Sequence, residues 1–181
     1  MSKNGLILLT PTSVDHTGTS ASISANGSVE FSACSELRLN GVFSADYDNY
    51  MVVARHLATF DGQGWRFRLS SGGADNSTAS SYTRQTLSAS STSISAGRAS
   101  SDFAVFSGAD DTQRAGTVGY FYGPFLAQPT AFRSVWVTGY ANAYLGDYAV
   151  THNQSTAYDG FNLYTFTGTV SGRVAVYGMR K

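Results

Sequence analysis

Cysteine is nearly absent from this sequence, and its scarcity rules out two kinds of stabilising site. Cys34 is the only cysteine, so the chain can form neither an internal disulfide nor a cysteine-based zinc site. Nothing near Cys34 in the sequence would lower the pKa of its thiol. We therefore expect Cys34 to be a small buried hydrophobic residue rather than a reactive group.

Charge is also scarce, and it is balanced. Charged residues make up 13% of the chain and the formal net charge is zero, so no broad electrostatic field draws in phosphate backbones or anionic lipids. Both lysines, Lys3 and Lys181, lie at the chain ends, and every internal cation is an arginine. A nucleic-acid-binding surface needs clustered positive charge, and the scattered arginines supply too little of it. We expect no nucleic-acid partner.

Long hydrophobic runs are missing as well. The longest apolar run near the start, Leu6–Leu9, is far shorter than the core of a signal peptide, and no stretch is long enough to span a bilayer. The sequence therefore predicts a protein made in a cytoplasm, with no membrane insertion.

Catalytic motifs are absent too. There is no G-x-S-x-G nucleophile elbow, and the three histidines, His16, His56 and His152, stand in unrelated contexts. Paired carboxylates, which glycan hydrolysis requires, have few candidates because Glu30 and Glu36 are the only glutamates. We predict that the protein is not an enzyme and needs no cofactor.

The aspartates are explained by turns rather than by metal binding. Most of them stand in turn contexts, where an Asp side chain bonds nearby backbone: Asp48, Asp61, Asp110 and Asp159. The segment 46–49 spaces oxygen ligands as calcium favours, but it lacks the glycine and distal glutamate of an EF-hand loop. The sequence leaves open whether a structural calcium ion is bound, but it assigns no residues to a metal site.

What the sequence does contain is the pattern of an all-β protein. No segment shows the spacing of an amphipathic helix, and short alternating stretches recur every 8–12 residues between glycine-containing turns. A chain of 181 residues with 13% aromatic residues can bury a core of its own. The sequence predicts one antiparallel β-sandwich or jelly-roll domain over 13–181. Residues 1–12 form either its first strand or an arm that pairs with a neighbouring subunit.

The segment Asp48–Leu69 is the predicted centre of this domain. Tyr50, Val52, Ala54 and His56 alternate with Met51, Val53, Arg55 and Leu57, and Trp65, Phe67 and Leu69 alternate with Arg66 and Arg68. The Asp61-Gly62 pair between the two arms is typical of a tight reversal. The pattern predicts a β-hairpin with one apolar face. Asn26-Gly27 predicts a second hairpin between neighbouring strands.

One aromatic stretch in the second half points to recognition, and an ordinary predicted strand precedes it. The predicted strand 131–138 places Phe132, Ser134, Trp136 and Thr138 on one face. After it, Tyr140, Tyr144 and Tyr148 are spaced four apart beside Asn142, which keeps them on one face of a continuous strand. Tyrosine beside asparagine and aspartate is the composition of surfaces that bind sugars or proteins. The alternative is that this face packs against the second sheet.

Several segments together follow a recurring pattern: 43–50, 73–82, Tyr122–Ser134 (YGPFLAQPTAFRS), 158–161 and 171–181. In this pattern they resemble the small virion proteins encoded among the structural genes of tailed bacteriophages. The resemblance extends from about Leu39 to the C-terminus, with Met179 where the closing Tyr-Gly-Tyr-Arg motif usually has its second tyrosine.

The resemblance implies a β-sandwich displayed on a phage particle, in a tail, fibre or capsid-surface role, and it brings no catalytic residues. We expect a homotrimer, because virion surface proteins commonly follow the symmetry axis on which they sit. Its partners would be other virion proteins and a host-surface glycan or protein. A tail-tip or fibre module that contacts the host is the first hypothesis, a capsid decoration protein the second, and a carbohydrate-binding lectin-like module outside any virion the third.

Overall fold

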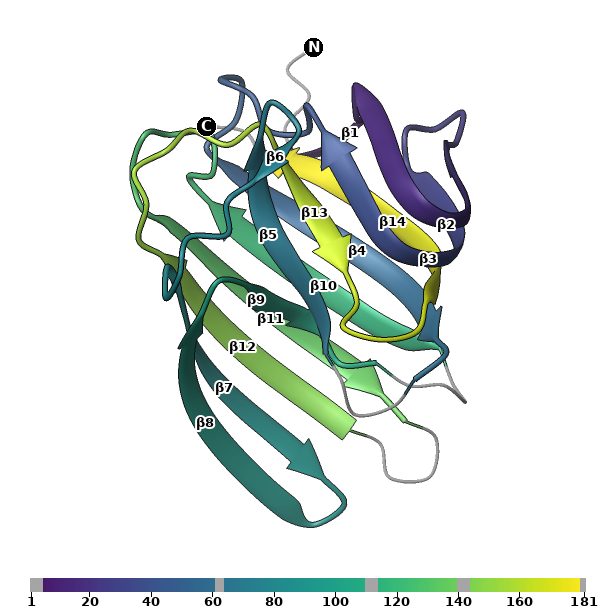
Figure 1. Ribbon diagram of the computed structural model, residues 1–181, viewed down its shortest axis with the longest axis vertical. Helices are drawn as coiled ribbons and strands as arrows, with labels where there is room; N and C mark the ends of the chain where they lie inside the picture. Colours follow the sequence, from purple (N-terminus) through teal and green to yellow (C-terminus); the bar gives the residue numbers. More distant parts are fainter. Residues whose placement is uncertain (1–4, 61–63, 110–113, 140–143, 180–181) are drawn as a thin grey trace.

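A computed structural model describes residues 5–60, 64–109, 114–139 and 144–179, and within them the fold is an all-β, jelly-roll-like sandwich (Figure 1). All the sheet pairings are antiparallel. The described part of the chain contains no helix that could span a membrane. The strands are β1 (Leu6–Leu9), β2 (Ser13–Ile23), β3 (Val29–Asn40), β4 (Asn49–Ala58), β5 (Trp65–Ser71), β6 (Ala74–Asp75), β7 (Tyr82–Ser90), β8 (Ser93–Ser101), β9 (Ala104–Ser107), β10 (Ala115–Tyr122), β11 (Thr130–Thr138), β12 (Tyr144–His152), β13 (Gly160–Tyr164) and β14 (Val170–Met179).

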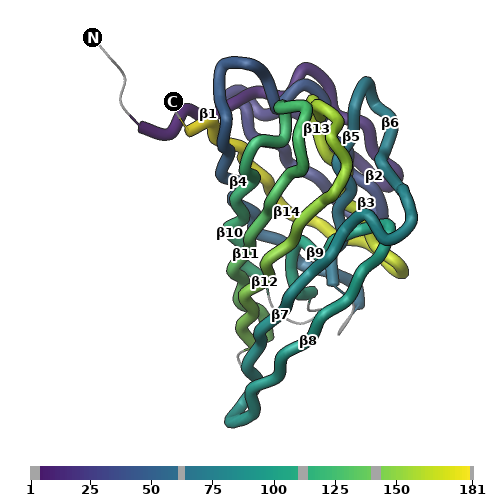
Figure 2. Tube along the Cα trace, turned by 90° about the vertical axis from the view of Figure 1, so that its left-hand side faces the viewer, coloured from purple at the N-terminus to yellow at the C-terminus, as the bar shows by residue number. Residues whose placement is uncertain are grey.

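One continuous sheet folds over to make two layers. Its strand order is β6-β5-β13-β3-β14-β4-β10-β11-β12-β7-β8, with β2 added to β3, β9 to β5 and β1 to β14. We call β14 through β8 the long layer and β6 through β3 the short layer. Figure 2 shows β4, β10 and β11 along one side of the molecule and β5 and β6 along the other, with the β7–β8 hairpin projecting beyond both.

The fold between the layers depends on a bulge in β3. The first half of β3, up to Cys34, pairs with β14, whereas its second half, from Glu36, pairs with β13. Near the end of the first half, Ala33 has a φ of 46°, a left-handed conformation that costs an L-residue roughly 1 kcal/mol. Its amide is satisfied, because Ala33 N–H donates to Ser171 Oγ over 2.8 Å. A strand that changes partners at a bulge is a common way to turn a sheet corner.

Aromatic rings from both layers fill the space between them. Phe121 of β10 is fully buried, and its ring centroid lies 5.3 Å from that of Phe67 in β5 and 5.3 Å from that of Phe161 in β13. On its own layer it contacts Phe132 at 4.6 Å. Such ring pairs stabilise a core beyond the area that they bury. The strand faces predicted to be apolar are the ones that meet in this core.

The predicted hairpin over Asp48–Leu69 is wrong, although both of its strands exist. β4 pairs with β10 and β14, and β5 pairs with β13, β6 and β9, so the two strands belong to opposite layers. Across the core, His56 and Trp65 lie with ring centroids 4.8 Å apart. In a hairpin, the apolar faces of β4 and β5 would lie side by side in one layer. Because the two strands instead form an arch between the layers, their apolar faces pack against each other. The predicted reversal at Asp61-Gly62 lies outside the described residues.

The predictions for the Asn26-Gly27 turn and for Cys34 are confirmed. The Asn26-Gly27 turn joins β2 to β3, which pair along nearly their whole length, as predicted. β1 pairs with β14 of the same chain, from Leu6 opposite Met179 to Leu9 opposite Val176. Cys34 is buried within β3, where burial raises the pKa of its thiol. A buried thiol of raised pKa is a poor nucleophile, which agrees with the predicted structural role.

Truncating the central ring tests this account of the core. We expect Phe121→Ala to lower the free energy of unfolding by about 3–5 kcal/mol, because it removes a ring that both layers contact. The matched control is Tyr122→Ala, one residue along the same strand, whose side chain faces outward. Chemical denaturation of both variants measures the difference. Similar losses for the two would contradict the layer assignment.

Two buried histidines predict an acid-sensitive fold. His56 and His152 are 0% and 1% exposed, and burial lowers the pKa of each to about 4. In the unfolded chain they titrate near 6.5, so between pH 6.5 and 4 the unfolded state binds more protons and stability falls with acidification. For His56 the loss reaches about 3 kcal/mol at the acid end. Unfolding curves across this window measure it, and His56→Gln should flatten the dependence. A stability unchanged down to pH 4 would contradict it.

Candidate recognition pocket

A small aromatic pocket is lined by residues from the last part of β11 and from β12. Figure 1 shows that β11 ends and β12 begins at the end of the sandwich from which the β7–β8 hairpin projects. The volume of the pocket is about 170 Å³. Two strands of the long layer supply most of its side chains, and backbone beside the short layer closes it. The lining residues are Gly64, Gly108, Ala109, Trp136, Thr138, Tyr144 and Tyr148.

Strand alternation turns the pocket side chains inward. Trp136 and Thr138 of β11 are 8% and 6% exposed, whereas Val137 between them points outward and is 55% exposed. The register with β12 places Tyr144 opposite Thr138 and Gly146 opposite Trp136. Cross-strand neighbours in such pairs share a face of the sheet. The tyrosines and the tryptophan therefore lie on the same inner face.

Two glycines hold the Trp136 ring in place. A Cβ on Gly108 would lie 2.5 Å from one edge of the ring, and a Cβ on Gly146 would lie 2.3 Å from the other. Only glycine allows such an approach of backbone to a ring. Tyr148 adds an edge-to-face contact, with ring centroids 5.5 Å apart and planes at 80°. The indole is thus fixed before any ligand arrives.

Several polar atoms around this ring have no hydrogen-bond partner. Trp136 Nε1, Thr138 Oγ1 and the neighbouring Ser134 Oγ are all buried, and none has a partner in the described part of the chain. Buried polar groups are nearly always paired, with protein, water or ligand. Of these atoms, Trp136 Nε1 and Thr138 Oγ1 belong to lining residues, so the pocket offers one donor and one hydroxyl to a guest molecule.

The described part of the pocket lining is electrically neutral. None of its described lining residues is charged. Nε2 of the buried His56 lies 3.1 Å from the carbonyl oxygen of Gly108, one of the lining residues. Because a carbonyl only accepts, Nε2 carries the proton, and burial keeps the pKa of His56 near 4. Burial also raises the pKa of Tyr148. At neutral pH the described lining residues are therefore uncharged.

The structure brings two of the four predicted recognition residues into this pocket. Tyr144 and Tyr148 both line it, whereas Tyr140 and Asn142 lie outside the described residues. The prediction missed Trp136 and Thr138 as site residues. Their alternation was visible in the sequence and placed them on an inner face. It did not indicate that the aromatic packing ends there.

The carboxylates that come close together elsewhere are held in a network. Glu36 and Asp75 both accept hydrogen bonds from Asn162 Nδ2, at 2.7 Å each, and both pair with Arg38, at 3.2 and 3.1 Å. Arg68 and Asp102 form another ion pair. Within the described residues no cluster of three or more His, Cys, Asp or Glu is placed to hold a metal. The charged groups of the short layer thus bind one another across its outer face.

No family model and no curated protein sequence matches the chain. Among solved structures, it is similar to the SPRY domain of human HERC1, at 8% identity and a TM-score of 0.39, over 98% of this chain and 99% of that one. The C-terminal CBM6 of the marine laminarinase LamC from Zobellia galactanivorans follows, at 12% identity and 0.31, over 96% and 99%. SO2946, of unknown function, from Shewanella oneidensis MR-1 has 10% identity and 0.30, over 97% and 79%. These TM-scores are below 0.5, and the similarities carry no argument about function.

Proposed function

We propose that this chain is a non-enzymatic recognition protein whose pocket binds one ring of a neutral saccharide. The observation that carries the proposal is the fixed Trp136 ring, surrounded by buried polar atoms that lack partners. A sugar presents an apolar C–H face that stacks on aromatic rings, and hydroxyls that pair with such atoms. The neutral lining favours an uncharged ligand, since burying a charge there would leave it unpaired.

The sequence resemblance supports a place for this module on a bacteriophage particle. We propose a tail-tip or fibre protein, probing a host-surface glycan and forming a trimer. The pocket supports this role because its lining includes the last residue of β11 and the first residue of β12, at the end of the sandwich from which the β7–β8 hairpin also projects (Figure 1). A lectin-like module outside any virion would use the same pocket and differs only in its setting.

Capsid decoration is the second candidate, and an exposed apolar surface favours it. On the outer face of the long layer, neighbouring strands present large hydrophobic side chains, with Ile94 77% exposed. Apolar surface of this extent often marks protein contacts. In a decoration protein, this face would lie against the shell. The residues concerned are Val53, Leu87, Ile94, Val135, Val137 and Leu145.

Sugar titrations test the pocket. We expect Trp136→Phe to weaken binding of a neutral monosaccharide about tenfold, because it removes the Nε1 donor and keeps most of the ring packing. Titration calorimetry against a panel of neutral sugars measures the affinity. Val137→Ala, on the opposite face of the same strand, is the control and should bind like the parent. If no sugar in the panel binds, or if Trp136→Phe binds unchanged, the pocket assignment fails.

Electron microscopy of labelled particles tests the setting. A tail or fibre protein predicts label confined to the tail region, and a decoration protein predicts label over the whole head. Absence of the protein from purified particles, together with sugar binding by the isolated domain, would leave the lectin alternative and refute a virion role.

A further inference from the structure

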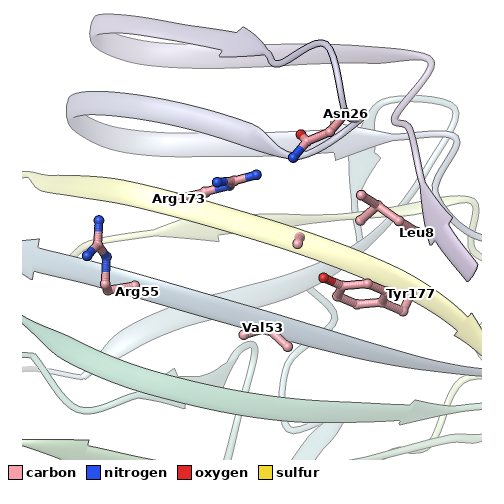
Figure 3. A pocket seen from close by; sticks show the side chains of 7 residues that line it. Leu8, Asn26, Val53, Arg55, Arg173 and Tyr177 are labelled. Atoms are coloured by element: carbon pink, nitrogen blue, oxygen red, sulfur yellow. The ribbon is translucent and has the colours of Figure 1, made fainter. Parts of the chain in front are cut away.

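A second site lies on the outer face of the long layer, on the side of β4 opposite to the core. It is a groove of about 490 Å³ between β14, β4, β1 and the turn that joins β2 to β3 (Figure 3). Arg55 and Val53 point into it from β4, whereas Ala54 between them is buried in the core. The groove is lined by Leu8, Asn26, Val53, Arg55, Arg173, Ala175 and Tyr177.

Two arginines stand directly opposite each other in this groove. Arg55 in β4 is the register partner of Arg173 in β14, and both side chains rise from the same face (Figure 3). Like charges facing each other across a ladder repel and destabilise the pair. The Arg55 side chain has neither an ion-pair partner nor a hydrogen-bond partner within the described residues. An anion between the guanidinium groups would relieve this repulsion.

A hydrogen-bond chain fixes the donors on one wall. Arg173 Nε donates to Ser28 Oγ over 2.8 Å, and Ser28 Oγ in turn donates to Asn26 Oδ1 over 2.8 Å. Asn26 Oδ1 also accepts from the Ser28 amide at 3.2 Å. These hydrogen bonds use Arg173 Nε and the Asn26 side-chain oxygen. The Arg173 Nη groups and Asn26 Nδ2 remain free to face the groove. Figure 3 shows the Asn26 amide nitrogen on the side of Arg173.

The groove has donors but no carboxylate. None of its lining residues is acidic, and the nearest acid, Glu30, approaches Arg173 only at Nε, over 3.7 Å. Glu30 is largely solvent-exposed, so it screens Arg173 weakly. Beside the donors, Leu8, Val53 and the Tyr177 ring supply an apolar wall. Guanidinium groups bind carboxylate and phosphate through paired hydrogen bonds. The free donors of Arg55 and Arg173 can form such pairs with a group in the groove.

We infer that this groove binds an oxyanion, the carboxylate or phosphate group of an acidic sugar, with Arg55, Arg173 and Asn26 as donors. The sugar ring would lie against the apolar wall beside Tyr177. The inference rests on the arginine pair and its hydrogen-bond chain, so it stands even if the Trp136 pocket binds no ligand. It gives the protein a charged recognition site distinct from the neutral one.

The test uses glucuronate and glucose 6-phosphate as anionic probes, with glucose as the neutral control, in NMR titrations of the whole protein. We expect both anions to shift the signals of Arg55 and Arg173, and glucose to leave them unchanged. Arg55→Gln should weaken anion binding at least fivefold. Added salt should weaken it further, because the site is exposed to solvent. Arg98→Gln, which removes an exposed arginine elsewhere on the long layer, is the matched control and should bind normally.

A thermal readout separates a built site from a general attraction to positive charge. Because Arg55→Gln removes like-charge repulsion, we expect the free variant to melt at or above the parent temperature. Glucuronate should raise the melting temperature of the parent but not of this variant. A response to glucuronate alone assigns the carboxylate, and a response to the phosphate alone assigns the phosphate. No shift with either anion, or equal losses in Arg55→Gln and Arg98→Gln, would overturn the inference, whatever neutral sugars do at Trp136.

Discussion

Contact between aromatic rings of opposite layers is the constraint on which the rest of this structure depends. Phe121 touches Phe67 and Phe161 across the core, and these contacts form only if the sheet folds over itself. The bulge at Ala33 makes that possible, because β3 leaves β14 and continues beside β13. The arch from β4 to β5 follows from the same requirement. Burial of two apolar faces against each other removes more surface from water than a flat hairpin would.

The recognition pocket is where this aromatic packing ends. Along β11, the inner face passes from Phe132, packed among rings, through Ser134 to Trp136 and Thr138. Toward this end of the strand, hydroxyl side chains alternate with the Trp136 ring. The hydroxyls of Ser134 and Thr138 have no hydrogen-bond partner within the described chain. Such atoms destabilise a closed core, since each buried polar group without a partner lowers the stability of the fold by about 1–3 kcal/mol. A binding site does use them, because the ligand supplies the missing hydrogen bonds.

The two proposed sites occupy opposite faces of the same layer and differ in character. The Trp136 pocket is inward, neutral and rigid, whereas the Arg55–Arg173 groove is outward, cationic and open. β4 contributes to both sites. His56 hydrogen-bonds the carbonyl oxygen of Gly108, a lining residue of the pocket, and Arg55 lines the groove. Alternation along one strand thus contributes residues to the surroundings of both proposed sites. Each site has side chains that would be more stable with a guest present.

The sequence by itself determined which residues lie inside and which outside. The period of two along β4, β5 and β11 predicted the buried faces, and the lack of helical periodicity predicted an all-β fold, because these patterns follow from backbone geometry alone. It also pointed to Tyr144 and Tyr148. The sequence did not determine which strands pair, since alternation shows which face of a strand is apolar but not which strand lies beside it. Only the tertiary structure decided that β4 and β5 face each other, that Trp136 closes a pocket between Gly108 and Gly146, and that Arg55 meets Arg173. Each of these depends on contacts between residues far apart in the chain, and their positions are set by how the whole sheet folds.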